Sequence, residues 1–277
     1  MSFELGQTIE GYQFVDVLNT SGLGVAYKVW NLSCGRFECL STLPDDPDGN
    51  HYGEDRFQRE IRIHRQLTHP NIASFYRSFK IGHRFVITTE LPEGVSLEKR
   101  FQEGYLSIQE GVDYVCQALE GIGYAHGKGV VHRCLAPSNL IITPDDRIKV
   151  IGFGFAKTPS DPRLTLQGFV IGVAEYIAPE QVSDTSRLDG RADLYSLGAI
   201  LYEAISGRKV FESKNYFELM SAHKNLRPRP PSLFRPDVPN ELEEFMLQAL
   251  QKDPSQRFQT ADAFRAALLA VTAIGVA

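Results

Sequence analysis

The residues whose types could do chemistry are concentrated in the middle of the chain. Cys134 and Asn139 lie in the segment VVHRCLAPSNLII, and Gly152 opens the triplet Gly-Phe-Gly a short way downstream. A cysteine thiolate can act as a nucleophile, and an amide oxygen can bind Mg²⁺ together with carboxylates. No neighbouring pattern activates Cys134, and a glycine at 152 offers no carboxylate. We therefore expect a structural role for Cys134 and no metal site at this triplet.

Composition and charge exclude several classes of function. The chain has 277 residues, of which 43% are apolar and 23% charged, and its net charge is −5. This charge gives no reason to expect nucleic acid as a partner. In the segment Lys224–Arg235, which is rich in Pro and Arg, we expect a solvated connection rather than a polyanion site. The four cysteines lack the spacing of a zinc site, so we interpret them as reduced thiols.

Neither end of the chain shows a secretion signal or a membrane span. The N-terminal segment lacks an apolar core, and no run reaches the roughly 18 apolar residues that a span needs. The C-terminal AALLAVTAIGVA favours a closing helix, or else the edge of a longer chain with a span beyond it. We expect a cytoplasmic location, either as a separate domain or as the cytoplasmic part of a membrane-associated protein.

Apolar patterns divide the chain into a strand-rich part and a helical part. Before residue 92, short or alternating apolar runs predict strands, with turn-like Asn19–Gly22 between the first two and a helix over Glu54–Leu67. After it, an amphipathic helix begins near Ile108 and ends at the Gly-rich turn His126–Gly129. Short strands are expected at VVH, NLIIT and RIKVIG, and helices at Asp193–Ser206, Tyr216–His223, Glu241–Gln251 and Thr260–Ala270. This is the plan of an α+β fold whose two lobes leave a crevice as the default ligand site.

Seven segments, taken in order, resemble the protein kinase family, and bacterial Ser/Thr kinases most closely. They are SGLGVAYKV, FQREIRIHRQLTHPNI, VVHRCLAPSNLII, IKVIGFGFAK, EYIAPEQ, RADLYSLGAILYEAISGRKVF and KDPSQRFQTA. The resemblance implies the bilobal protein-kinase fold, with a small β-rich N-lobe that holds one helix and a larger, mainly helical C-lobe. It implies a single domain over residues 1–277, with the N-lobe at 1–91 and the C-lobe at 92–277.

The positions that this family uses for phosphoryl transfer carry other residue types here. Ser41 stands where a lysine holds the phosphates, and Cys134 stands where an aspartate orients the substrate hydroxyl group. Ala136 replaces the lysine of the same loop, and Gly152 replaces the aspartate that binds Mg²⁺. Val173 replaces a threonine that bonds to that first aspartate and lysine, so a polar trio is lost as a unit. We therefore predict that no catalytic set is intact and that no metal is bound.

Two residues of the implied site are retained. Glu60 matches the glutamate that pairs with the missing lysine, and Asn139 matches a metal ligand. Because an unpaired buried carboxylate is costly, we expect Glu60 to point to solvent or to find another cation. Lys28, on the neighbouring strand, is a candidate for that cation.

The nucleotide cleft is expected to be degenerate as well. Of the glycines in the phosphate-covering loop, the resemblance matches the third, Gly24, and Thr89 is the gatekeeper. Pro92 falls where a backbone N–H would donate to adenine, and proline has none. The cleft residues that the resemblance implies are Gly22, Gly24, Ala26, Cys39, Thr89, Glu90, Leu91 and Ile141. We expect weak or no binding of Mg-ATP and therefore no cofactor.

Residues that stabilise the fold of the family are kept. Glu180 and Arg257 match an internal ion pair, and Asp193 matches a brace of the central loop. The structural positions that the resemblance implies are His132, Arg133, Phe153, Glu180, Asp193 and Arg257. Random decay would damage stabilising and catalytic residues alike, so we infer a folded domain that has lost its catalytic residues selectively.

We therefore predict a pseudokinase, which is not an enzyme and serves as a regulatory or protein-binding module. The resemblance implies a protein partner in signalling and a homodimer through the N-lobe. Thr158, Ser160 and Thr165, in the loop Phe155–Tyr176, are candidates for phosphorylation and for pairing with Arg133, although ordinary loop composition is the better explanation for them. Two alternatives stay open: an atypical kinase or other nucleotide-using transferase with a rebuilt site, and a receptor for another small ligand in the cleft.

Overall fold

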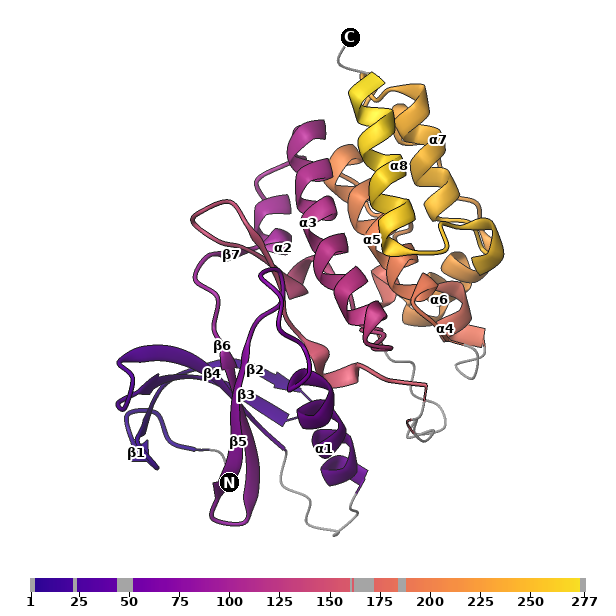
Figure 1. Cartoon of the computed structure of the whole chain (residues 1–277). Helices are drawn as coiled ribbons and strands as arrows, with labels where there is room; N and C mark the ends of the chain where they lie inside the picture. Colours follow the sequence, from indigo (N-terminus) through magenta and orange to yellow (C-terminus); the bar gives the residue numbers. More distant parts are fainter. Residues whose placement is uncertain are drawn as a thin grey trace.

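The structure is a computed structural model that describes residues 3–21, 24–43, 52–159, 161, 172–183 and 188–274. The strands of a large sheet, coloured indigo to purple in Figure 1, occupy one end of the molecule together with helix α1 (Tyr52–His64). The helices from α3 (Ile108–Gly127) onward, coloured magenta to yellow, occupy the other end. The expected α+β arrangement, with a small β-rich lobe and a larger helical lobe, is therefore confirmed.

The large sheet of the N-lobe has six strands in the order β1-β2-β3-β4-β6-β5, and all neighbours are antiparallel. Its strands are β1 (Thr8–Ile9), β2 (Tyr12–Ser21), β3 (Gly24–Asn31), β4 (Arg36–Thr42), β5 (Phe75–Ile81) and β6 (Arg84–Glu90). Along β4, burial alternates between residues because successive side chains of a strand point to opposite faces. Glu38, Leu40 and Thr42 are buried on one face, whereas Cys39 and Ser41 are half-buried on the other.

Strand β2 is longer than the sequence predicted. Asn19–Ser21, interpreted above as part of a turn, continues the strand and pairs with the start of β3. The pairing brings the backbone of Gly24 so close to β4 that a Cβ atom there would lie 1.9 Å from the carbonyl oxygen of Thr42. Gly24 also has φ +133, so only glycine fits this position. Close strand packing is thus sufficient to explain this glycine.

Helix α1 packs on the sheet through Phe57 and Ile61, which form a small core cluster with Ile87 of β6. It ends at His64, about one turn before the predicted end at Leu67, because the chain turns there and the Leu67 N–H donates to the carbonyl oxygen of His64. The helix therefore presents its C-terminal turn to the junction between the two lobes.

The C-lobe is built around α3 and α5, and much of their length is buried. Its helices are α2 (Leu97–Phe101), α3 (Ile108–Gly127), α4 (Pro179–Ser183), α5 (Arg191–Ser206), α6 (Tyr216–Asn225), α7 (Asn240–Ala249) and α8 (Ala261–Ile274). A capping box between Ser107 and Glu110 fixes the start of α3. The predicted helices are present, while the short helices α2 and α4 were not predicted.

A three-stranded sheet joins the lobes in the order β7 (Val95–Ser96), β8 (Leu140–Ile142) and β9 (Ile148–Val150). The predictions of strands in NLIIT and RIKVIG are confirmed by β8 and β9. The predicted strand VVH is reduced to a single bridge between Val131 and Lys157. Among the described ranges, none of the helices combines the length and apolar character that a membrane crossing requires.

Candidate functional site

A buried carboxylate holds the loop that contains Cys134. Asp193, on α5, is 1% exposed, and its two oxygens accept hydrogen bonds from the backbone N–H groups of His132 and Arg133, both at 2.8 Å. Its Oδ2 also lies 2.8 Å from Nε2 of His126 on α3. Burial acts to raise the pKa of Asp193, but the bond from His126 and the neighbouring donors outweigh it, so the pKa is lowered. Asp193 is therefore an ionised brace of the loop, as the resemblance implied.

A column of three rings connects this loop to α1. The ring of Phe153 lies 4.6 Å from the ring of His132 and 5.3 Å from the ring of His64, measured between centroids. His132 bonds through Nε2 to the carbonyl oxygen of Ile151, and His64 to that of Ala73. Burial lowers the pKa of both histidines, so both rings are neutral near pH 7. The sequence predicted structural roles for His132 and Phe153, whereas it gave His64 no role beyond the predicted helix Glu54–Leu67.

The expected ion pair between Glu180 and Arg257 is present in the C-lobe. The guanidinium group of Arg257 donates to both carboxylate oxygens of Glu180, at 2.7 and 2.8 Å. It also donates to the carbonyl oxygens of Gln251, Lys252 and Arg191, and its side chain is fully buried. A charge with this many partners is stabilised where it is, and removing either member would leave the other unpaired.

The positions around Cys134 form an apolar surface. The Cys134 thiol is buried, and burial raises its pKa to about 11. The thiol is therefore protonated near pH 7, which agrees with a structural role rather than a nucleophilic one. Ala136 is 1% exposed, and Val173 packs against the same core. Cys134, Ala136 and Val173 themselves carry no charge near pH 7.

Gly152 and Asn139 face each other at the position where, by the resemblance, kinases bind Mg²⁺. Gly152 has φ +87, and a Cβ atom added to it would lie 2.9 Å from the amide group of Asn139. The Nδ2 atom of Asn139 donates to the carbonyl oxygen of Cys134 at 2.8 Å, which fixes this amide against the loop. One amide oxygen without a carboxylate does not fit Mg²⁺. Within the described ranges, no three His, Cys, Asp or Glu side chains are placed to hold a metal ion.

Glu60 is half-buried, and its carboxylate lies beside Gly154. A Cβ atom added to Gly154 would lie 3.3 Å from Oε2 of Glu60, which places this carboxylate against the loop after Gly152. Lys28 does not serve as its cation, because the Lys28 ammonium group lies 4.2 Å from the ring centroid of Phe37, further back along β4. The expectation that Glu60 points to solvent or finds another cation stays a prediction, with Lys28 not in the place of that cation.

The residues predicted for the roof of the cleft lie on adjacent strands. Ala26 pairs with Ser41, and Cys39 pairs with Thr89, so all four occupy neighbouring positions of the sheet. The Cys39 sulfur lies 3.9 Å from Oγ of Ser41. Burial raises the pKa of the Cys39 thiol, so this part of the sheet offers no charge to a phosphate group.

The predicted residues at the junction of the lobes are partly engaged by the protein itself. Glu90 accepts a hydrogen bond from Nζ of Lys149 at 3.0 Å and another from the N–H of Ser74. Leu91 precedes Pro92 in the link between the lobes, and Ile141 lies on β8; both are half-buried. Their roles in nucleotide binding remain predictions.

Several predicted residues lie at the edge of the described ranges or beyond it. Gly22, Ser160 and Thr165 are outside the described residues. Thr158 is described: its backbone N–H and its hydroxyl group both donate to Oδ2 of Asp161, which is also in contact with Arg62 of α1. Thr158 thus has a local structural role in this loop.

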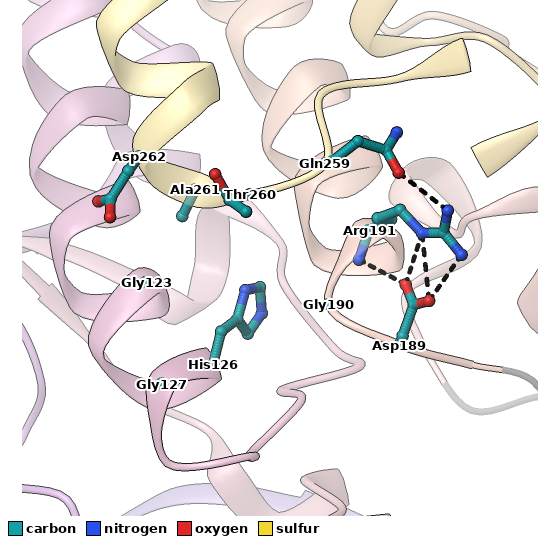
Figure 2. A pocket seen from close by; sticks show the side chains of 10 residues that line it. All are labelled: Gly123, His126, Gly127, Asp189, Gly190, Arg191, Gln259, Thr260, Ala261 and Asp262. Atoms are coloured by element: carbon teal, nitrogen blue, oxygen red, sulfur yellow. Dashed lines mark hydrogen bonds and ion pairs between the residues drawn. The ribbon is translucent and has the colours of Figure 1, made fainter. Parts of the chain in front are cut away.

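A pocket that the sequence did not predict lies in the C-lobe, away from these positions. Figure 2 shows it between the end of α3 and the starts of α5 and α8, with His126 at one wall and the bonded pair Asp189–Arg191 at another. Its volume is about 570 Å³. It is lined by Gly123, His126, Gly127, Asp189, Gly190, Arg191, Gln259, Thr260, Ala261 and Asp262. A Cβ atom on Gly190 would lie 2.7 Å from the His126 ring, so this glycine leaves room for the ring that bonds Asp193.

Comparison with known proteins places this geometry among kinases. The family described as "Protein kinase domain" matches residues 12–269. The chain is 34% identical to "Serine/threonine-protein kinase pkn3" of Myxococcus xanthus over 96% of the chain and 51% of that protein. It is 32% identical to "Serine/threonine-protein kinase PknA" of Mycobacterium tuberculosis over 99% of the chain and 64% of that protein. The chain thus spans about half to two thirds of the length of these two relatives.

A solved structure agrees with the fold. The Mycobacterium tuberculosis PknI kinase domain superposes with a TM-score of 0.74 at 26% identity, covering 98% of this chain and all of the other. The bilobal kinase fold expected from the sequence is therefore confirmed.

The prediction that the chain is not an enzyme is wrong. Relatives that are 30–34% identical over most of the chain are named serine/threonine-protein kinases, which points to an enzyme. The prediction relied on residue types alone, at Ser41, Pro92, Cys134, Ala136, Gly152 and Val173.

Proposed function

The chain belongs to the protein kinase family, and from this premise we propose that it serves as a regulatory, protein-binding domain with a degenerate nucleotide site. Residues 1–91 and 92–277 would act as the two lobes of one domain, engaging a protein partner in signalling within the cytoplasm. Mg-ATP would bind weakly. The homodimer through the N-lobe belongs to the same proposal.

The observation that carries this proposal is the contact between Gly152 and Asn139. The position where the family binds Mg²⁺ has no carboxylate, and its left-handed backbone lies directly against the Asn139 amide. Phosphoryl transfer depends on metal ions and cations placed on the phosphates. Ser41 and Ala136 support the proposal as well, because neither side chain carries an ammonium group that would hold the phosphates.

Nucleotide binding tests the proposal directly. We expect millimolar ATP, with or without Mg²⁺ or Mn²⁺, to raise the melting temperature of the purified chain by less than about 1 °C, since a ligand far below saturation stabilises little. A clear Mg²⁺-dependent shift would contradict weak binding. A shift that needs no metal would show that the cleft binds nucleotide in a different way.

A second candidate function is phosphoryl transfer by a rebuilt site, which the names of the relatives favour. Glu60 and Asn139 would have to take part, because they are the retained polar residues that lie at the site. Transfer of labelled phosphate from ATP to the chain itself or to a general protein substrate would be measured for the wild type, Glu60→Gln and Asn139→Ala. The exposed Glu93→Gln serves as the control.

The outcomes separate the two functions. Transfer that is lost in Glu60→Gln and Asn139→Ala but kept in Glu93→Gln would establish the rebuilt site. Transfer that is equal in all variants would come from a contaminating kinase. No transfer in any of them, together with the absent thermal shift, would support the regulatory role.

A further inference from the structure

A proline-rich segment between α6 and α7 carries exposed cations without an ion-pair partner. Lys224, Arg227 and Arg229 are exposed, and none of them forms a salt bridge with another residue in the part of the chain that the structure describes. No acidic residue occurs between Lys224 and Arg235. A chain whose net charge is −5 therefore has a short positive strip on its C-lobe.

The backbone of this strip is extended at Leu226 and Pro230, whereas Lys224 and Asn225 belong to α6 and Pro231–Leu233 form a short 3-10 helix. Leu226 has φ −91 and ψ 145, and Pro230 has φ −57 and ψ 130, both near polyproline II geometry. The Leu226 N–H donates to the carbonyl oxygen of Ala222, and the Tyr202 hydroxyl group donates to that of Arg229. The strip is therefore held at both ends before any partner binds.

Arg235 anchors the far end of the strip. Its guanidinium group donates to the carbonyl oxygens of Leu106 and Ile205, bonds to Asp237, and lies over the ring of Tyr105. Arg235 is thus used by the fold, whereas the three exposed cations before it are not. This contrast separates a structural cation from the ones that are available to a ligand.

Large apolar side chains are exposed on the same strip. Leu226 is 56% exposed, Leu233 67% and Phe234 39%. A single exposed leucine needs no explanation, but several beside cations that form no salt bridge among the described residues have the composition of a binding surface. The apolar groups would add contact area, and the cations would select the charge of the partner.

We propose that the strip Lys224–Phe234 is a docking site for an extended acidic segment of a partner protein, with carboxylates toward Arg227 and Arg229 and apolar side chains over Leu226 and Leu233. The inference rests on the proposed protein-binding role and gives it a surface. An anionic membrane fits less well, because the rest of the chain carries an excess of acidic residues that a planar anionic surface would repel. A narrow peptide meets only the strip.

Binding of a labelled peptide tests the electrostatic part of the proposal. The probe is a fluorescein-labelled peptide that repeats Glu, Leu and Pro, and the readout is fluorescence anisotropy with the full chain. We expect Arg227→Gln/Arg229→Gln to weaken binding about tenfold, since exposed charge pairs contribute modestly, and added salt to weaken the wild type similarly. The control, Arg65→Gln/Lys99→Gln, makes the same charge change at two exposed sites elsewhere and should leave binding unchanged.

A second pair of variants tests the apolar part. Leu226→Ser should weaken peptide binding several-fold, because a contacting leucine is lost. Leu32→Ser is the matched control, since Leu32 has the same exposed fraction of 56% on the other lobe. Circular dichroism of each variant checks that the fold is intact.

Three results would overturn the inference. They are an undetectable interaction with the peptide, an equal loss of binding in the control variants, and tighter binding to phosphatidylglycerol vesicles than to the peptide. None of these depends on nucleotide binding or phosphoryl transfer, so the inference and the proposed function can fail separately.

Discussion

The loop that begins at His132 differs on its two sides. Toward α5, its backbone N–H groups donate to the Asp193 carboxylate, which also bonds to the His126 ring. Away from these bonds, it carries a buried thiol at Cys134, protonated near pH 7, and the buried methyl group of Ala136. The difference shows that the stabilising contacts of the loop are separate from the groups that would do chemistry. A site of this kind can change its polar residues together without losing the loop that carries them.

The largest effect should come from the bonded side. Asp193→Ala leaves two buried backbone N–H groups and His126 without their acceptor, so we expect the free energy of unfolding to fall by about 3–5 kcal/mol. Urea denaturation at pH 7 measures it. The control is Asp113→Ala, an exposed aspartate bonded to Gln109, which should cost less than about 0.5 kcal/mol. Equal losses of unfolding free energy in Asp193→Ala and Asp113→Ala would contradict the stabilising role of the Asp193 side of the loop.

The ion pair of the C-lobe should follow. Arg257→Met breaks a fully buried guanidinium–carboxylate contact, and we expect a loss of about 3 kcal/mol. Arg265→Met breaks the pair with Glu120, in which both side chains are about 40% exposed, and should cost about 1 kcal/mol or less. The same urea titration compares them, and a larger loss for Arg265→Met would contradict the role of burial.

A substitution at Gly190 should disturb the contact between His126 and Asp193 more mildly. Its φ of −57 suits any residue, so Gly190→Ala acts only by pushing the His126 ring away from Asp193, at about 1–2 kcal/mol. Gly127→Ala, in the same pocket, meets no atom within 4 Å and should be neutral within about 0.5 kcal/mol. Thermal unfolding of both variants checks this, and a neutral Gly190→Ala would show that the His126 contact is dispensable.

Restoring a carboxylate on the cleft side should cost less again. Gly152→Asp places a side chain at φ +87, and we expect a loss of about 1 kcal/mol, which is at the low end of such strain because Asp tolerates this region best. Asn139→Ala removes the neighbouring amide, so the double variant should lose less than the sum of the single losses. Additive losses in a double-mutant cycle would mean that the two residues do not interact.

We expect the Cys134 thiol of the folded chain to be alkylated slowly. Its pKa of about 11 keeps the thiol protonated below that pH, and the thiolate needed for alkylation forms only as the pH rises toward 11. Mass spectrometry after iodoacetamide treatment at pH 8 should find the exposed Cys34 modified first. Unfolding in urea should make the two thiols equally reactive. Rapid labelling of Cys134 in the folded chain would contradict its burial.

The parts of the fold that could be predicted from the sequence are those fixed by local pattern. The start of α3 at Ile108 follows from its capping box and apolar spacing, and the pair Glu180–Arg257 followed from the resemblance. The direction of Glu60 could not be predicted, because it depends on how α1 is rotated against the loop of Gly154. The pocket of Figure 2 was missed because three helix ends, far apart in sequence, form it.

The sequence shows which residue types are replaced at the site, but it does not decide whether the site is active. Residue types at Ser41, Cys134 and Gly152 state which groups are missing, and the structure adds how the space they leave is filled. Whether the remaining groups still move a phosphate is a property of the assembled site, and the names of the relatives weigh against a decision from residue types alone.

The contact between Gly152 and Asn139 also bears on the history of the chain. A change that restored an aspartate at 152 would meet a left-handed backbone and the amide that already occupies the space of its Cβ. Each step back toward a metal-binding carboxylate would then lower stability before any benefit appeared. We expect this loss of stability to disfavour a return to aspartate at 152, although that return needs a change at one residue only.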